Sequence, residues 1–381
     1  MKEYKTRLAD CILQKKFASS GAVLIEGAKW CGKTTTASQI AKSILFMQDP
    51  AQKKQNLEMA DIDPSFLLNG QTPRLIDEWQ LAPKLWDAIR YEVDKRDEFG
   101  QFVLTGSAVP ADLSEISHSG TGRISRMLMR PMSLYESGES NGSVSLGDLF
   151  SDNEKVAGTN SLDLEQIAFL ICRGGWPKSI GTNTDVALQL AINYFDAVVN
   201  DDISRVDNVK RDSEKTKRIL RSYARSIASQ AKITSITQDV YANEETEDLT
   251  NKNATISSYI SALKKIFVIE DSLAWNPNLR SKTAIRASDT RYFTDPSIGA
   301  AALGLGPRDL INDIQTMGLM FENLCIRDLR IYADALDGQV YHYRDRNNLE
   351  CDAVVHLRNG SYAYSHPNTA EKFSTKLKEE Q

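Results

Sequence analysis

A glycine, four variable residues and then Gly-Lys-Thr occupy residues 27–34 of the chain. This spacing is typical of a loop whose backbone N–H groups surround phosphate oxygens. In such a loop the Lys33 ammonium contacts the β- and γ-phosphates of a nucleoside triphosphate, and the Thr34 hydroxyl binds Mg²⁺. We therefore expect ATP and Mg²⁺ to be bound here. The residues expected to bind the nucleotide are Gly27, Ala28, Lys29, Trp30, Cys31, Gly32, Lys33, Thr34 and Thr35.

The sequence on either side of this loop favours phosphate binding over a chance match in a Gly- and Thr-rich turn. Residues 23–25 form a short apolar run that is typical of a buried strand. Residues 34–44 carry apolar side chains at helical spacing, so we expect a helix there. Strand, loop and helix therefore follow one another in the order that a phosphate-binding loop requires.

Two adjacent acids, Asp77 and Glu78, follow a second apolar run at residues 75–76. Asp77 would hold Mg²⁺ through water, and Glu78 would act as the general base toward the attacking water. Adjacent acids are also common in solvated loops. Their position after an apolar strand and downstream of the phosphate loop favours the catalytic interpretation.

A third expected strand, residues 102–108, ends in Thr105 and Ser107, where a polar side chain would sense the γ-phosphate. Beyond it, Arg123, Arg126 and Arg130 lie within eight residues. In an oligomer, Arg123 or Arg126 would reach the γ-phosphate of a neighbouring subunit and take part in catalysis. Such arginines can equally form a structural clamp or a solvated face, and the sequence leaves these alternatives open.

The overall composition sets the class of protein. With 381 residues, 41% of them hydrophobic and 25% charged, we expect two or three soluble, globular domains. The apolar run at residues 21–25 is far too short to span a bilayer, so we expect a cytoplasmic protein. Five cysteines without paired spacing argue against a disulfide framework or a zinc site. A net charge of −5 means that nucleic acid could bind only at a local basic face.

Six segments in order resemble a large prokaryotic family of AAA-type ATPases with a C-terminal domain of unknown function. They are GAKWCGKTTTA, LIDEWQ, LTGSA, GRISRMLMRPMSLYESGES, CRGGWP and NDDISRVDNVKRD. The resemblance covers residue 5 to about residue 360 and implies an α/β fold: an AAA-type P-loop NTPase with a parallel sheet, a winged-helix domain, and a tail resembling PD-(D/E)XK nucleases. The expected segments are 1–137 for the ATPase core, 138–205 for a loop and helical lid, 206–300 for the winged helix and 301–381 for the tail.

Between core and winged helix we expect a polar loop and then helices. Residues 164–177 predict a helix that is stopped by Gly174, Gly175 and Pro177. Further on, the acidic pair Asp201 and Asp202 is expected to be a solvated helix end rather than a metal site.

The expected winged helix offers a candidate contact face for DNA. Its first helix carries a basic stripe, and a later helix over residues 253–266 turns polar side chains outward. The stripe consists of Lys217, Arg218, Arg221 and Arg225, and the outward residues are Ser257, Ser258, Ser261, Lys264 and Lys265. Helix-turn-helix folds also dock proteins, and both alternatives stay open.

The tail departs from the nuclease pattern that the resemblance implies. Asp352 fits the first metal-binding acid, but the expected Glu-x-Lys is missing, with His366 and Asn368 at the equivalent positions. That motif was lost either by substitution or by deletion of a segment. We therefore expect a degenerate or truncated tail without nuclease activity, and we expect Glu322 to be a helix-surface carboxylate.

These observations predict an ATP-hydrolysing molecular switch or motor that acts on DNA through its C-terminal domains, as a homo-oligomer. The alternative is an ATPase regulator whose C-terminal domains dock protein partners in signalling or defence. A nucleoside or small-molecule kinase would share the phosphate loop. Nothing in the chain resembles a pocket for a phosphoryl acceptor, so we disfavour a kinase.

Overall fold

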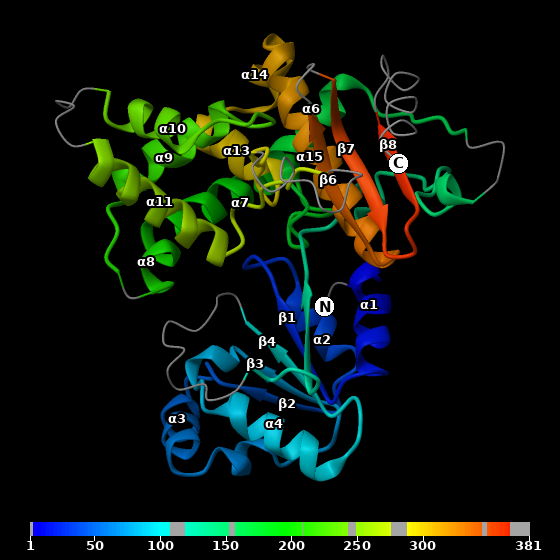
Figure 1. Ribbon diagram of the computed structural model, residues 1–381, viewed down its shortest axis with the longest axis vertical. Helices are drawn as coiled ribbons and strands as arrows, with labels where there is room; N and C mark the ends of the chain where they lie inside the picture. The colour runs from blue at the N-terminus through cyan, green and yellow to red at the C-terminus, as the bar shows by residue number, and fades with distance from the viewer. Residues whose placement is uncertain are drawn as a thin grey trace.

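The protein is described here from a computed structural model that covers residues 3–106, 119–151, 157–207, 209–242, 249–275, 288–344 and 349–365. The candidate residues Ser107, His366 and Asn368 lie outside these ranges. Figure 1 shows an α/β part at the bottom, which holds a parallel sheet, and a largely helical part above it. A small antiparallel sheet completes the upper part.

Five short parallel strands in the order β2-β3-β4-β1-β5 form the sheet of the α/β part. Three of them confirm the strands predicted at residues 23–25, 75–76 and 102–108, although the third ends at Thr105. Because the strands run parallel, their carboxyl ends meet at one edge, where the loops that follow them come together. The strands are β1 Ala22–Glu26, β2 Ser43–Phe46, β3 Arg74–Asp77, β4 Phe102–Thr105 and β5 Ile124–Leu128.

Helices cover both faces of this sheet. On one face, α1 (Leu8–Phe17) and α2 (Lys33–Ser38) pack against the apolar side chains of β1. On the other face lie α3 (Lys53–Ile62), η1 (Pro64–Leu68) and α4 (Leu85–Arg96). Short helical turns also follow β3 and β5, namely η2 Trp79–Leu81, α5 Leu134–Ser137 and η3 Asp148–Phe150.

The helix predicted over residues 34–44 is wrong beyond Ser38. Helix α2 ends there, and Ile44 belongs to strand β2, where it pairs with Leu75 of β3. The apolar spacing that suggested a continuous helix spans two elements, since Ala37 is buried on α2, whereas Ile44 lies in β2 and is 39% exposed. Residues 43–46 form a strand because they pair with β3, about thirty residues further along the chain. Local periodicity cannot reveal such pairing.

The upper part is built mainly from helices that share one apolar core. The helix predicted from residue 164 is confirmed and ends at Arg173, where Gly174 has a left-handed φ of 71°. The helices are α6 Leu164–Arg173, α7 Thr184–Ala197, η4 Val198–Asp202, α8 Ile203–Arg205, α9 Ser213–Arg225, α10 Ile233–Val240, α11 Leu249–Lys265, α13 Pro296–Leu303, α14 Pro307–Asn312 and α15 Ile314–Ala335. The η4 segment is a π-helical turn that continues α7.

Three of these helices, α9, α10 and α11, pack on one another, and two antiparallel bridges follow them in the chain, Ile269 with Phe293 and Ser272 with Thr290. After α15 come three antiparallel strands, β6 (Gly338–Arg344), β7 (Glu350–Leu357) and β8 (Tyr362–Ser365). In the described part of the chain, no helix is both long enough and apolar enough to cross a bilayer.

The two parts meet through buried ionic contacts as well as apolar packing. Arg130, which follows β5, donates to Glu270 (2.8 Å from Nε) and to Asp334 of α15 (2.6 Å). The two guanidinium groups of Arg130 and Arg330 hold the pKa of Glu270 at about 2, although its burial alone would raise it. The α/β part is therefore clamped to the upper part at the end of β5.

Candidate nucleotide site

Three polar side chains converge where the sheet strands end. The hydroxyl groups of Thr34, at the start of α2, and of Thr105, at the end of β4, both donate to Oδ1 of Asp77, each at 2.6 Å. The structure thus brings together the two residues predicted to bind Mg²⁺, Thr34 and Asp77. Thr105, one of the two polar residues expected near the γ-phosphate, joins them from the end of β4.

The Lys33 side chain is folded back onto the phosphate loop. Its ammonium is buried and donates to the carbonyl oxygens of Gly27 and Ala28, each at 2.8 Å. Among the described residues, no carboxylate forms an ion pair with Lys33. Its positive charge is therefore available to an anionic group that can displace the two carbonyls.

The loop backbone needs glycine at its first position. Gly27 has a φ of 147°, and a Cβ there would lie 2.0 Å from the carbonyl oxygen of Met129. Gly32, with a φ of 105°, begins α2. The loop therefore curls tightly beside the chain that leaves β5, and its N–H groups can approach a ligand without obstruction from side chains.

Glu78 lies one residue beyond β3 in the left-handed conformation, with a φ of 57°. Its carboxylate accepts a hydrogen bond from the side-chain amide of Gln80. A Cβ at Gly106, just after β4, would lie 2.8 Å from Gln80 Oε1, so Gln80 bridges the ends of the two strands. Sequence reasoning missed Gln80, because an amide in a short turn carries no motif.

The variable residues of the loop contact the helical part. Lys29 forms an ion pair with Asp202 of η4, and the ring of Trp30 meets Tyr194 of α7 edge-on, with centroids 5.8 Å apart. The prediction that both Asp201 and Asp202 are solvated is wrong for Asp202, which is 8% exposed, whereas Asp201 is exposed and pairs only with Arg205. The π-helical turn places these neighbouring acids in different environments.

Arg7 is a second residue that sequence reasoning missed. Its buried guanidinium donates to the carbonyls of Cys31 and Arg130, each at 2.9 Å, and lies 3.0 Å from Glu136. It thus ties the phosphate loop to the segment after β5. No pattern in the sequence distinguishes this arginine from an ordinary residue before a helix.

The three arginines predicted near the site separate into two groups. Arg130 is a buried clamp between the two parts of the molecule, as described above. Arg123 pairs with Asp94 of α4 at 2.7 Å, and Arg126 pairs with Glu26 of β1 at 2.9 Å. Both remain about half exposed along the edge strand β5. Of the three arginines, these two therefore stay candidates for the predicted action on a neighbouring subunit.

The tail places its acids differently from the prediction. Glu322 is not a surface carboxylate, because it is partly buried on α15 and accepts a hydrogen bond from the buried hydroxyl of Tyr292. Burial, together with the charges of Asp352 and Glu350, raises the pKa of Glu322 to about 7. Asp352 is exposed on β7. Within the described residues, no three acids, histidines or cysteines lie close enough to hold a metal ion.

Two segments of the chain match known families. Residues 19–138 match the family model described as an AAA domain, and residues 164–309 match a domain of unknown function, DUF8612. The uncharacterized proteins Rv2008c of Mycobacterium tuberculosis and Mb2031c of Mycobacterium bovis are each 22% identical over 364 residues, which are 94% of this chain and 73% of theirs.

Two solved structures are distantly similar. The Walker-type ATPase PABY2304 of Pyrococcus abyssi is 12% identical with a TM-score of 0.47, over 78% of this chain and 96% of that protein. PH0952 from Pyrococcus horikoshii, a signal transduction ATPase with a tetratricopeptide repeat sensor, is 10% identical with a TM-score of 0.24, over 88% and 48%. Both TM-scores are low, so these two structures carry no argument about this chain. The match of residues 19–138 to an AAA domain supports a nucleotide-binding P-loop domain in the α/β part.

Proposed function

We propose that this chain binds Mg·ATP at the phosphate loop and hydrolyses it, and that the helical part senses the state of the loop. The observation that carries the proposal is the meeting of Thr34, Asp77 and Thr105 at one carboxylate oxygen beside Lys33. A loop with a purely structural role does not require a buried lysine and an acid at the edge of a parallel sheet.

The residues present fit Mg·ATP. Lys33 contacts only neutral carbonyl oxygens, and a phosphate oxygen is a stronger partner for an ammonium than a carbonyl is. The Thr34 hydroxyl and the Asp77 carboxylate are the hard oxygen ligands that Mg²⁺ prefers. Bound Mg²⁺ would neutralise charge on the β- and γ-phosphate oxygens.

During hydrolysis, Lys33 leaves the loop carbonyls and holds phosphate oxygens. Glu78 exchanges the Gln80 amide for the attacking water and takes a proton from that water at its carboxylate. In the structure the Gln80 amide donates to Oε2 of the Glu78 carboxylate, so it competes with the attacking water for that oxygen. Any rearrangement of the loop also reaches the helical part, because Lys29 and Trp30 contact Asp202 and Tyr194.

Calorimetry with Mg·ATP and a phosphate-release assay test this proposal directly. We expect one site per chain and steady release of phosphate. The Lys33→Ala variant is the control, because it removes the ammonium but leaves the fold intact. If the unaltered chain shows no affinity for Mg·ATP, the proposal is wrong.

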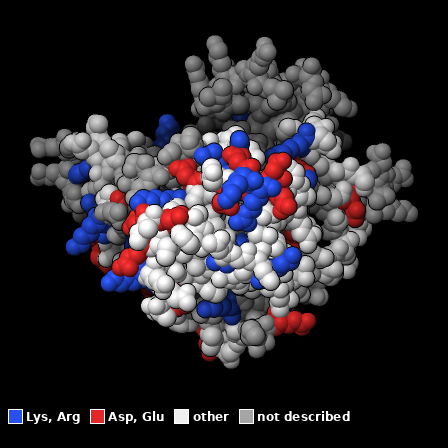
Figure 2. Space-filling view, turned by 90° about the horizontal axis from the view of Figure 1, so that it is seen from below, with Lys and Arg blue, Asp and Glu red and all other residues white. Residues whose placement is uncertain are grey.

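DNA is the partner that we propose for the upper part. The support is the arrangement of α9, α10 and α11 followed by bridged extended segments, which is the order of elements in a winged helix. Exposed residues of α11 include Ser258, Ser261 and Lys265. Figure 2 shows, by contrast, that acidic and basic side chains intermingle on the face seen from below, so that face offers no continuous basic surface.

One observation favours the protein-docking alternative instead. Three of the predicted basic contacts are neutralised by neighbouring acids: Lys217 pairs with Glu214, Arg225 with Asp239, and Lys264 with Asp271. Binding of duplex and branched DNA, measured over a range of salt concentrations with and without ATP, separates the two. Affinity that falls steeply with salt supports DNA, and absence of binding at low salt supports docking of proteins.

A further inference from the structure

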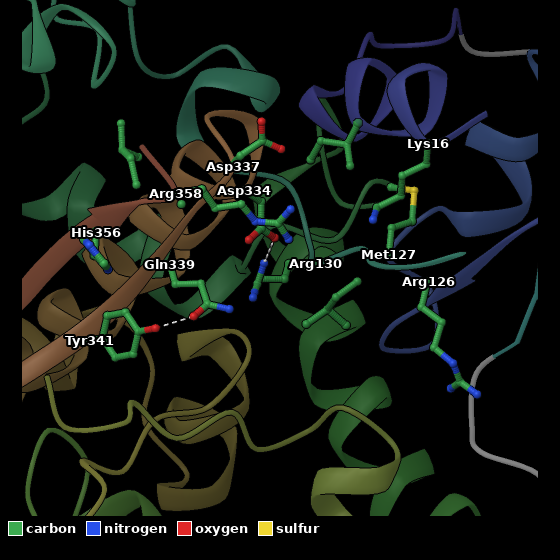
Figure 3. A pocket seen from close by; sticks show the side chains of 14 residues that line it. Lys16, Arg126, Met127, Arg130, Asp334, Asp337, Gln339, Tyr341, His356 and Arg358 are labelled. Carbon is green, nitrogen blue, oxygen red and sulfur yellow. Dashed lines mark hydrogen bonds and ion pairs between the residues drawn. The ribbon is translucent and has the colours of Figure 1, made fainter. Parts of the chain in front are cut away.

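A cavity of about 370 Å³ lies at the junction of the two parts of the molecule. Three regions of the chain line it. They are α1, then β5 with the residues after it, and finally the end of α15 together with β6 and the end of β7 (Figure 3). It therefore exists only while the α/β part is docked onto the upper part. Its volume falls in the range of sites for small molecules.

Most charged groups around the cavity already have partners. Arg130 and Asp334 pair with each other, and Arg126 pairs with Glu26. Asp337 accepts a hydrogen bond from Lys15, the neighbour of Lys16. These pairs neutralise the two carboxylates that line the cavity.

Two cations are left over. Lys16 of α1 and Arg358, just beyond β7, line the cavity, and neither side chain makes a hydrogen bond or ion pair within the described part of the chain. Figure 3 shows Lys16 on the α1 side of the cavity and Arg358 on the side of β6 and β7. The hydrogen bond from Lys15 and the charges of Lys15, Arg358 and Lys16 lower the pKa of Asp337, so both cations lie near enough to act on that carboxylate.

We propose that this cavity binds a compact phosphate-bearing anion between Lys16 and Arg358. A phosphate monoester carries nearly two negative charges at neutral pH, which matches two cations that make no ion pair in the described part of the chain. The Arg358 guanidinium can donate to two phosphate oxygens at once, and Lys16 contributes a point charge. His356 and Tyr341 line the same cavity and offer further polar groups.

Because Lys16 belongs to the α/β part and Arg358 to the upper part, one anion that touches both stabilises their docking. The site is distinct from the phosphate loop and does not depend on ATP hydrolysis. It is an effector site, in which a small phosphorylated compound sets how firmly the two parts are held together.

The test uses the full chain carrying Lys33→Ala, so that the phosphate loop contributes as little as possible. Inorganic pyrophosphate and AMP are titrated by calorimetry at low salt, with succinate as a dicarboxylate comparison. We expect at least one phosphate probe to bind, and Lys16→Gln with Arg358→Gln to weaken that binding by about tenfold or more. The matched control is Lys95→Gln, because Lys95 is an exposed lysine on α4 that pairs with Glu92.

Three results would overturn the proposal. The first is absence of binding by both phosphate probes, and the second is binding that the double substitution leaves unchanged. The third is succinate binding as tight as that of the phosphates. Failure of the phosphate loop to bind ATP would leave this test unaffected, since the Lys33→Ala chain is its starting point.

Discussion

Asp202 in the upper part forms an ion pair with Lys29 in the phosphate loop, although 173 residues separate them in the chain. Beside this pair, Trp30 packs against Tyr194. The two contacts tie the variable residues of the loop to the upper part. The conformation of the loop is thereby linked to the helices that follow.

We expect Asp202→Asn to weaken Mg·ATP affinity by about fivefold or more, because Lys29 loses its partner and the loop becomes less ordered. Calorimetry measures the affinity. Asp201→Asn is the matched control, since Asp201 is exposed and, among the described residues, pairs with Arg205. Adding Lys29→Gln to Asp202→Asn should cause little further loss. Equal affinities of Asp202→Asn and the unaltered chain would contradict the link.

Lys33→Ala should abolish ATP hydrolysis, because the only buried ammonium of the described loop is lost. Phosphate release under saturating Mg·ATP is the measurement. Lys95→Ala is the control, because Lys95 is an exposed lysine on α4 that pairs with Glu92, and it should retain most of the activity. Hydrolysis at the normal rate in Lys33→Ala would place the chemistry elsewhere.

Glu78→Gln should leave Mg·ATP binding intact and slow turnover by about 10²- to 10⁴-fold, because an amide cannot accept the proton of water. Binding by calorimetry and single-turnover hydrolysis separate the two effects. A comparison with Gln80→Ala, which removes this hydrogen-bond donor, tests whether the hydrogen bond restrains the base. Unchanged turnover in Glu78→Gln would remove it as the general base.

Arg123 and Arg126 are the candidates for action across a subunit interface. In mixtures, a chain with Arg126→Ala, or one with Arg123→Ala, is combined with a Lys33→Ala chain. If the arginine acts on a neighbour, the mixture regains part of the hydrolysis that each variant lacks alone. Activity that merely equals the weighted sum of the two variants would contradict action across a subunit interface.

Arg130→Ala should destabilise the chain by about 3–5 kcal/mol, because Glu270 and Asp334 are left without their buried partner. Denaturant unfolding measures this, with the exposed Arg123→Ala as a control that should cost less than about 1 kcal/mol. The pKa of Glu270 is lowered to about 2 in the folded state. Its contribution to stability is therefore complete above its unfolded pKa and is lost as pH falls toward 2.

Much of the nucleotide site could be read from the sequence because its signals are local. The glycines, Lys33 and Thr34 lie within one loop, and short apolar runs mark β1, β3 and β4 on either side of Asp77. Parallel pairing then brings the strand ends together as a matter of geometry. Whether these residues turn over ATP stays a prediction.

The tertiary structure alone decided which charged residues are buried and with whom. Asp201 and Asp202 are adjacent and chemically identical, yet only Asp202 meets the phosphate loop. Arg130 looks like Arg123 in the sequence, but its partners Glu270 and Asp334 lie far along the chain. Residue type and spacing report local preference, whereas burial and ion pairing depend on distant segments that only folding brings into contact.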